Sequence, residues 1–358
     1  MTHFLRDILR QPDQLQRTID YLTGVGLPKL EEAAAVVRNA RHVYLTGMGS
    51  SWHAALSVAP LFYLGAHPLY MQDAGELLQF SNFPANAVII VISRSGRSVE
   101  IVKLIAKARE SGATVIGITS SEDGPLAQQA QISINVPVAP DHAISVNTYS
   151  ALAAAAGALG GVIVGAFDVN ISNSLLRAIA ETKHTMASWQ QQIADTAWLE
   201  PGRVTYLLAR GPGLGSCHEA RLLWEEGAKS PATAMGTGSF RHGPQEMVTK
   251  DARFGIWIHG ERMRAQDLAV ARDLRRLGAS VMLIGQNIPT DIGDVVFQLP
   301  TVPAEWQFLI DIIPAQLAAE RLARLAGVDS DSFRFSSFVV EDEYGLFHEK
   351  AAAPKDDQ

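Results

Sequence analysis

Short apolar runs alternate along the chain with longer segments in which apolar positions recur at helical spacing. An uninterrupted apolar run, such as residues 88–92, is typical of a strand buried on both faces inside a parallel sheet. Strands that alternate with helices in this way predict a doubly wound parallel sheet with helices on both faces. The predicted strands are 42–47, 68–72, 88–93, 114–119 and 131–136, and the helices between them begin near Ser51, Ala74, Ser98 and Leu126.

The same pattern recurs in the second half of the chain. The strand that begins near Val43 is echoed by one that begins at Thr205. Echoes of the last three strands of the first half lie at 254–259, 280–285 and 295–300. A repeat of this length predicts a duplicated α/β domain and not a solenoid.

Helical patterns surround and join the two copies, at 4–40 (with a break near Gly24 to Pro28), 172–198 and 304–326. The predicted organisation is therefore an N-terminal helical segment (1–30), a first domain (31–168), a helical linker (169–200), a second domain (201–345) and a C-terminal tail (346–358), which is predicted to be disordered past Lys350.

Three serines follow the apolar strand 88–92 at its junction with the next helix. Ser93, Ser95 and Ser98, with Gly96 among them, place hydroxyls and backbone N–H groups at a helix N-terminus, where anions bind. One serine is enough to cap a helix, so three of them favour a phosphate site.

Arginines interleave with these serines, and a second turn is expected beside them. Arg94 and Arg97 either contact the phosphate or face solvent, and the sequence leaves both open. The turn at 47–51 follows a neighbouring strand and meets the serines at the same sheet edge, because ligands bind at the carboxyl ends of such strands. In the second copy the matching turn, 259–262, has no hydroxyl side chain, so only the first copy is expected to hold phosphate.

The second copy carries candidate proton-transfer residues. Glu226 lies on a predicted helix that begins near Ser216, and His242 is followed by Gly243 and Pro244, which places it on a loop or at a helix start. A carboxylate can act as a base and an imidazole as an acid near neutral pH.

Composition narrows the classes of partner and cofactor. The 358 residues are 47% hydrophobic and 19% charged, and the net charge of −7 disfavours a nucleic-acid or membrane partner. The turn at 47–52 has Trp52 where a dinucleotide fingerprint needs its third glycine, and no Walker A lysine follows. His53, His142 and His259 show no metal-ligand spacing, so neither a cofactor nor a metal is expected.

The remaining features favour a cytoplasmic protein. Cys217 is the single cysteine, which excludes an internal disulfide, and it is interpreted as a buried, inert thiol. The uncharged stretch 149–167 is nearly long enough to span a bilayer, but its alanines and glycines favour a packed internal helix. The first residues show no charged-then-apolar leader.

Together these motifs resemble a tandem sugar-isomerase (SIS) protein. The chain is similar to the isomerase half of the glutamine–fructose-6-phosphate aminotransferases and, in its second half, to the fructosamine-6-phosphate deglycases. Four segments are similar: the N-terminal 6–12, the turn at 49–51, the serine-rich turn at 93–98 (the serine turn), and the loop at 240–244 that contains His242.

The resemblance implies roles for individual residues. Ser51, Ser93, Ser95 and Ser98 would hold a sugar 6-phosphate with Arg94 nearby, and Gly49, Ser50 and Arg334 would be further substrate contacts. Glu226, 16 residues before His242, would move a proton between C1 and C2, while His242 would assist ring opening or protonate the leaving group. The family's histidine loop often crosses to a neighbouring subunit, so the resemblance also implies a homodimer with the site near the interface.

Departures from the aminotransferases shift the expected reaction. Leu223 and Ser336 stand where those enzymes have lysines, and the chain contains no glutaminase domain, so glutamine-dependent synthesis is disfavoured. The leading prediction is a deglycase-like enzyme that acts on a hexose 6-phosphate carrying an amino or alkylamino group. The alternatives are an aldose–ketose isomerase, a hexosamine-6-phosphate deaminase, and a non-catalytic sugar-phosphate sensor.

Overall fold

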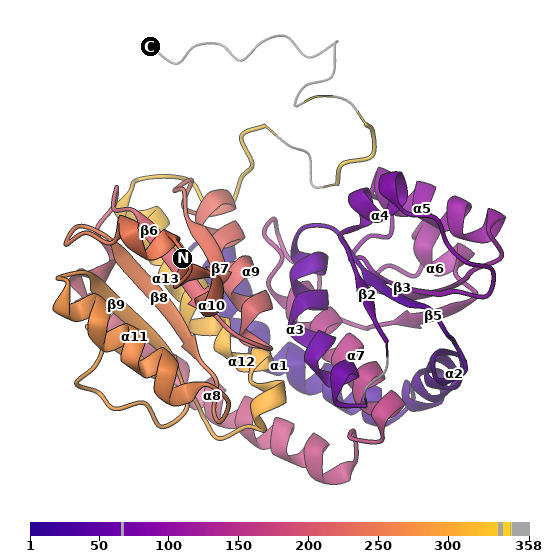
Figure 1. The fold of residues 1–358 in the computed structure, drawn as a ribbon, viewed down its shortest axis with the longest axis horizontal. Coiled ribbons are helices and arrows are strands. Elements are labelled where there is room, and N and C mark those ends of the chain that lie inside the picture. The colour runs from indigo at the N-terminus through magenta and orange to yellow at the C-terminus, as the bar shows by residue number, and fades with distance from the viewer. Residues whose placement is uncertain (66–67, 336–338, 344, 346–358) are drawn as a thin grey trace.

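A computed structural model of the chain describes residues 1–65, 68–335, 339–343 and 345. It contains two five-stranded parallel sheets with helices on both faces, which confirms the predicted fold class. Figure 1 shows the sheets in two lobes, the first in indigo and purple and the second in orange. The predicted tail, 346–358, and Ser336 lie outside the described residues.

The first sheet has the strand order β2-β1-β3-β4-β5. All five residues of its central strand β3 are buried, as expected for an apolar run with helices on both sides. The strands are β1 (Val43–Thr46), β2 (Tyr70–Met71), β3 (Val88–Ile92), β4 (Thr114–Thr119) and β5 (Ile132–Asn135), and the helices between them are α3 (Ser50–Leu64), α4 (Ala74–Phe80), α5 (Val99–Glu110) and α6 (Pro125–Gln129).

The second sheet repeats this topology, with the order β10-β9-β8-β6-β7. Its strands are β6 (Thr205–Ala209), β7 (Thr233–Gly236), β8 (Arg253–Ile258), β9 (Ser280–Gly285) and β10 (Val295–Gln298). Its helical segments are α9 (Gly213–Glu226), α10 (Thr237–Phe240), η2 (Pro244–Met247) and α11 (Arg264–Arg276). Strand β7 is missing from the sequence prediction, because this short edge strand is only partly buried and carries no continuous apolar run.

The remaining helices connect the lobes and cover them. They are α1 (His3–Thr23), α2 (Leu27–Arg38), α7 (Asn147–Val164), α8 (Val169–Asp195), η1 (Ala197–Leu199), η3 (Ala304–Trp306), α12 (Phe308–Asp311) and α13 (Ile313–Leu325). The prediction of one helix over 304–326 is therefore wrong. Pro314 lies in the first turn of α13 and lacks the N–H that would continue α12 into it.

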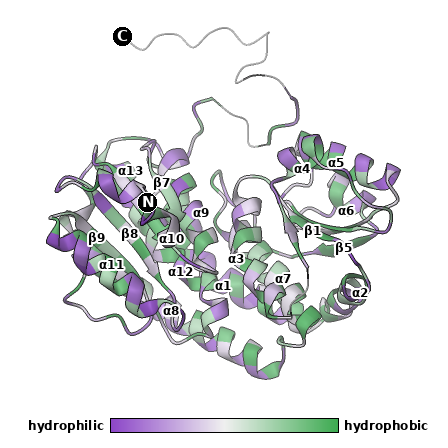
Figure 2. Cartoon of the chain, in the orientation of Figure 1, coloured by the Kyte–Doolittle hydropathy of each residue, from purple (hydrophilic) through white to green (hydrophobic). Residues whose placement is uncertain are grey.

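Helix α7 accounts for the uncharged stretch that is nearly long enough to span a bilayer. Within the described part of the chain, α7 is the one helix that is long and apolar enough to cross a membrane. However, 89% of it is buried inside the protein. Figure 2 shows it mostly green and white, whereas the outer helix α11 mixes purple and green. Its glycines admit close neighbours, since a Cβ at Gly160 would lie 2.9 Å from the ring of Phe62 on α3.

The two lobes share one core and meet where α3 crosses α9. The largest cluster of buried apolar side chains includes Ile90 of the first sheet and Leu207 of the second. At the crossing a Cβ on Gly215 would lie 2.2 Å from the carbonyl oxygen of His53 and 2.1 Å from Oγ of Ser57. Glycine at this position lets the two backbones approach, which brings the end of α9 to the edge of the first sheet.

Candidate active site

A cavity of about 290 Å³ lies at the carboxyl ends of β1 and β3 and reaches across to α9. The structure brings most of the predicted residues together here, because the walls include Gly49, Ser50, Ser51, Ser93, Arg94, Ser95, Ser98 and Glu226. The cavity therefore combines the serine turn of the first lobe with a carboxylate of the second. The sequence did not predict the wall residues Ala143, Ser145, Leu222 and Phe333.

Hydrogen bonds to the backbone hold the hydroxyl groups of Ser93 and Ser95 in fixed positions. Ser93 Oγ accepts a hydrogen bond from the Gly96 N–H (3.1 Å), and Ser95 Oγ accepts one from the Arg97 N–H (3.2 Å). Each hydroxyl can therefore still donate its own proton to an anion. Ser98 is the N-cap residue of α5 but makes no side-chain cap bond. Hydroxyl groups with donors to spare are suited to bind phosphate oxygens.

Gly96 fixes the shape of this turn. Its φ of 64° lies in the left-handed region that glycine adopts readily, and a Cβ there would lie 2.7 Å from Cβ of Leu126. The backbone can therefore bend sharply between β3 and α5, which turns Ser95 and Ser98 toward the cavity.

The two arginines of the turn differ in position. Arg94 lines the cavity, and its Nη1 donates to Ser145 Oγ (3.1 Å) and to the Ala143 carbonyl oxygen (3.4 Å). Burial lowers the pKa of this guanidinium, while the negative charges of Asp141 and Glu226 oppose that change. Arg97 is exposed and is not among the residues that line the cavity.

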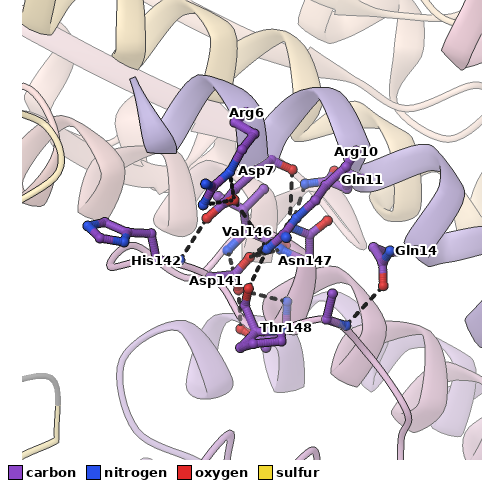
Figure 3. Close-up of polar contacts among 12 residues, drawn as sticks. Arg6, Asp7, Arg10, Gln11, Gln14, Asp141, His142, Val146, Asn147 and Thr148 are labelled. Carbon is purple, nitrogen blue, oxygen red and sulfur yellow. Dashed lines mark hydrogen bonds and ion pairs between the residues drawn. The ribbon is translucent and has the colours of Figure 1, made fainter. Parts of the chain in front are cut away.

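A polar network holds the loop that Arg94 contacts (Figure 3). Asp141 accepts hydrogen bonds from the backbone N–H groups of Val146, Asn147 and Thr148 at the start of α7 (2.9–3.1 Å). Asp7 of α1 accepts the His142 N–H at 2.7 Å. This network gives the N-terminal segment 6–12 a physical role, because it fixes the loop residues Ala143 and Ser145 against the cavity.

Glu226 is the last residue of α9 and is partly buried in the cavity wall. Burial, followed by the negative charge of Glu219, raises the pKa of Glu226 to about 7, against the opposing positive charges of Arg94 and Lys229. A carboxyl group with a pKa near neutrality accepts and returns protons efficiently. The cavity thus places a carboxyl group with a near-neutral pKa beside a turn that carries several hydroxyl donors.

Sequence reasoning missed a buried pair next to this carboxyl group. Glu219, two turns before Glu226 on α9, accepts hydrogen bonds from Ser50 Oγ (2.9 Å) and pairs with His53 Nδ1 (2.8 Å). Glu219 and His53 are both buried. The pair links α3 to α9, and its members are 166 positions apart in the sequence, so no local pattern reveals it.

Other predicted positions lie apart from this cavity or outside the described part of the chain. His242 is exposed in the turn after α10 and is not among the residues that line the cavity. Arg334 is also exposed and lines a neighbouring cavity. Leu223 is fully buried in the core, so an apolar side chain occupies that position of α9. Cys217 is buried as well, and burial raises the pKa of its thiol well above the usual range.

In the second copy the turn 259–262 corresponds to the serine turn of the first. Its backbone N–H groups are bound by a side chain of the turn itself. His259 Nδ1 accepts hydrogen bonds from the backbone N–H groups of Glu261 (3.1 Å) and Arg262 (3.0 Å). In the first copy two backbone N–H groups are also accepted by side chains, Gly96 by Ser93 and Arg97 by Ser95, but these serine hydroxyls line the cavity and keep their own protons for a ligand. Within the described ranges, no group of three or more His, Cys, Asp or Glu side chains could hold a metal ion.

Residues 37–159, which span the first sheet and its serine turn, match the model of the SIS domain family. This part of the chain is a SIS domain. Over 346 residues the chain is 25% identical to a glutamine–fructose-6-phosphate aminotransferase of Pyrobaculum aerophilum, and over 344 residues it is 26% identical to one of Pyrococcus horikoshii. These alignments cover 93% and 92% of this chain but only 56% of each relative, so the chain spans about half the length of these relatives.

Solved structures show the same fold over most of this chain. The C-terminal domain of the Francisella tularensis glucosamine–fructose-6-phosphate aminotransferase superimposes with a TM-score of 0.84 at 17% identity, covering 92% of this chain and 98% of that one. A glucosamine-6-phosphate deaminase of Thermotoga maritima gives 0.80 at 20% identity (95% and 99% covered). A tagatose-6-phosphate ketose/aldose isomerase of Escherichia coli gives 0.79 at 18% identity (92% and 94% covered).

Proposed function

We propose that the protein is a phosphosugar isomerase-type enzyme that acts on a hexose 6-phosphate carrying an amino or alkylamino group. The observation that carries this proposal is the shared cavity, in which the serine turn faces Glu226. A phosphate held by the turn fixes one end of an open-chain sugar, and the carbons at its other end then lie within reach of the carboxylate. The names of the relatives, all of which concern sugar 6-phosphates, support the same substrate class.

In the proposed reaction Glu226 takes a proton from C1 of a ketose whose C1 carries the amine, while the C2 carbonyl oxygen gains a proton. The product of this step is an enaminol. Glu226 then returns its proton to C2, which leaves an imine between C1 and nitrogen. Water adds to C1, the C–N bond breaks, and nitrogen leaves with a proton, so that an aldose 6-phosphate and a free amine form. Deglycase-like release of the amine needs no oxidant or reductant.

In the proposed reaction, His242 acts from a second copy of the chain. Its loop is exposed and lies outside the cavity of its own subunit. We therefore place His242 of the partner subunit at the cavity in a homodimer, where the imidazole would assist ring opening and protonate the departing nitrogen.

A panel of hexose, hexosamine and fructosamine 6-phosphates, with products identified by mass spectrometry, tests the proposed function. Release of a free amine or amino acid is expected. Glu226→Gln should lower kcat by about two to four orders of magnitude, the usual contribution of a general base, and should leave phosphate binding intact. Normal turnover by this variant would remove Glu226 from the mechanism.

The same panel decides between the alternatives. Release of ammonia would indicate a hexosamine-6-phosphate deaminase, and interconversion of aldose and ketose without loss of nitrogen would indicate an isomerase. Both reactions share the first proton abstraction and the same cavity. Binding of fructose 6-phosphate without turnover of any compound would favour a sugar-phosphate sensor.

A further inference from the structure

The loop of His242 must be rigid if it is to carry a catalytic group beyond the surface of its own subunit. His242 is exposed in the turn after α10, and Gly243 and Pro244 follow it. Surface loops are more mobile than the elements they connect, whereas a misplacement of about 1 Å can slow a reaction by about a hundredfold. A loop in this role therefore needs a support built from the rigid part of its own lobe.

Arg210 lies directly behind the start of this loop. It follows Ala209, the last residue of β6, whose carbonyl oxygen accepts a hydrogen bond from Thr237 Oγ1 (3.3 Å) at the start of α10. The guanidinium lies against Gly238, because a Cβ at Gly238 would lie 3.0 Å from Nη1 of Arg210. A glycine at this position thus admits the arginine to the back of the turn.

Gly238 belongs to the same tight turn as His242. The backbone N–H of Arg241 donates to the carbonyl oxygen of Gly238 (3.2 Å), and that of His242 donates to the carbonyl oxygen of Ser239 (3.0 Å). Phe240 anchors the turn from its apolar side, because its ring is buried in the core of the second lobe. The backbone of the turn therefore passes any shift of the guanidinium on to His242.

Asp267, in the first turn of α11, holds the guanidinium in place. Its Oδ1 accepts a hydrogen bond from Arg210 Nε at 2.8 Å, and its side chain is fully buried, whereas that of Arg210 is 23% exposed. Burial raises the pKa of Asp267, and the hydrogen bond and positive charge of Arg210 oppose that change. Movement of Arg210 away from Asp267 would leave an unpaired charge inside the protein, so the pair keeps one geometry.

These contacts form a continuous path from α11, through the end of β6, to the His242 loop. Neither Arg210 nor Asp267 lines the cavity that contains Glu226, so any effect on the reaction passes through the loop. Resting on the proposed function, in which His242 acts in the site of a second subunit, we propose that Arg210, held by Asp267, is a positioning residue for His242.

Arg210→Lys tests the proposal, because lysine keeps a positive charge beside Asp267 but lacks the planar guanidinium that lies against Gly238. The kcat of this variant is expected to fall about tenfold to a hundredfold, as for a slightly misplaced catalytic group. Arg203, just before β6, offers a matched control, since its side chain is 29% exposed and pairs with Glu200 at 2.8 Å. Arg203→Lys should retain the normal kcat.

Mixed dimers show which catalytic group Arg210 serves. An equal mixture of Arg210→Lys and Glu226→Gln should recover about a quarter of the normal activity, because the mixed dimer has one site with an intact base and an intact histidine loop. A mixture of Arg210→Lys and His242→Asn should recover nothing beyond its residual activity, since both changes damage the same half of each site. The reverse pattern would place Arg210 behind Glu226, and no recovery in either mixture would indicate a general structural role. Both of these outcomes would overturn the proposal.

Hydrogen exchange of residues 237–248 tests the loop independently of catalysis. Exchange in this segment should be faster in Arg210→Lys than in the unmodified protein, and Arg203→Lys should match the unmodified protein. Equal exchange in all three proteins would overturn the positioning role and leave the proposed function standing. If the unmodified protein turns over no compound of the panel, the proposed function fails, and the exchange measurement alone then decides whether Arg210 fixes the loop.

Discussion

Glu226 shows how neighbouring charges adjust one carboxyl group. Burial and Glu219 raise its pKa, and Arg94 and Lys229 hold that rise to a value of about 7. Arg94 belongs to the first lobe and Glu219 to the second, so the basicity of Glu226 depends on both halves of the chain. At this pKa the group is about half ionised at neutral pH, which suits a base that must also give its proton back.

The pH dependence of activity follows from this value. Because Glu226 must be ionised to take a proton, kcat/KM is expected to fall about tenfold per pH unit below about pH 7. Glu219→Gln removes a negative charge that raises the pKa of Glu226, so this acid limb should move to lower pH. A limb that stays in place in Glu219→Gln would contradict the assignment of Glu226 as the titrating base.

Single residues could be predicted from the sequence where a local pattern marked them. Ser93, Ser95 and Ser98 stand together at a strand-to-helix junction, and the structure places all three in one cavity wall. The Glu219–His53 pair joins residues on different helices, and the sequence assigned His53 no role. Lys229 was missed as well, because its contact with Ser332 spans 103 residues.

At the scale of elements, the crossing of α3 and α9 decides whether the two halves of the site meet. Ser50 and Ser51 lie at the start of α3, and Glu226 lies at the end of α9. Gly215 sits between the two helices with no room for a Cβ. The distance between the serine turn and Glu226 therefore depends on the close approach of the two helices at Gly215.

Gly215→Ala is expected to force the helices apart, since a Cβ would lie 2.2 Å from the His53 carbonyl oxygen, which is backbone and cannot turn away. Overpacking of this kind destabilises a protein by about 1–3 kcal/mol, and kcat should fall because the base moves away from the sugar. Urea unfolding and steady-state kinetics measure the two effects. Gly112→Ala, at a positive-φ glycine with open space around it, should destabilise the protein without altering kcat.

Elements were predictable where burial imposes a continuous apolar run. The bounds of β4 and β9 agree with the predicted strands to the residue, because each is apolar along nearly its whole length. The edge strand β7 has four partly buried residues and no such run. The break between α12 and α13 was missed because apolar positions continue across it, although Pro314 marked the boundary.

At the scale of the whole molecule, the two copies of one topology carry different halves of the site. The first sheet ends in the serine turn, and the second lobe supplies Glu226 and the loop of His242. A single chain therefore contains the turn and the base in one cavity but leaves His242 outside it. The proposed homodimer makes the site complete.

Mixed dimers test this arrangement. Glu226→Gln and His242→Asn should each be inactive alone, because each dimer then lacks one group in both sites. If His242 acts across the interface, a dimer of one subunit of each kind has one intact site, and an equal mixture should recover about a quarter of the normal activity. No recovery after verified subunit exchange would place His242 in its own subunit's site, and normal activity of His242→Asn alone would remove it from the mechanism.

The imidazole ring of His259 makes the turn of the second copy chemically different from the serine turn of the first copy. Its Nδ1 accepts two backbone N–H groups just after the end of β8, so these two donors are already bound by the protein itself. The corresponding turn of the second copy therefore offers neither these donors nor a hydroxyl side chain to an anion. The second lobe thus satisfies this turn with its own side chain and carries Glu226 beside the hydroxyl-lined cavity wall of the first lobe, which stays open to a ligand.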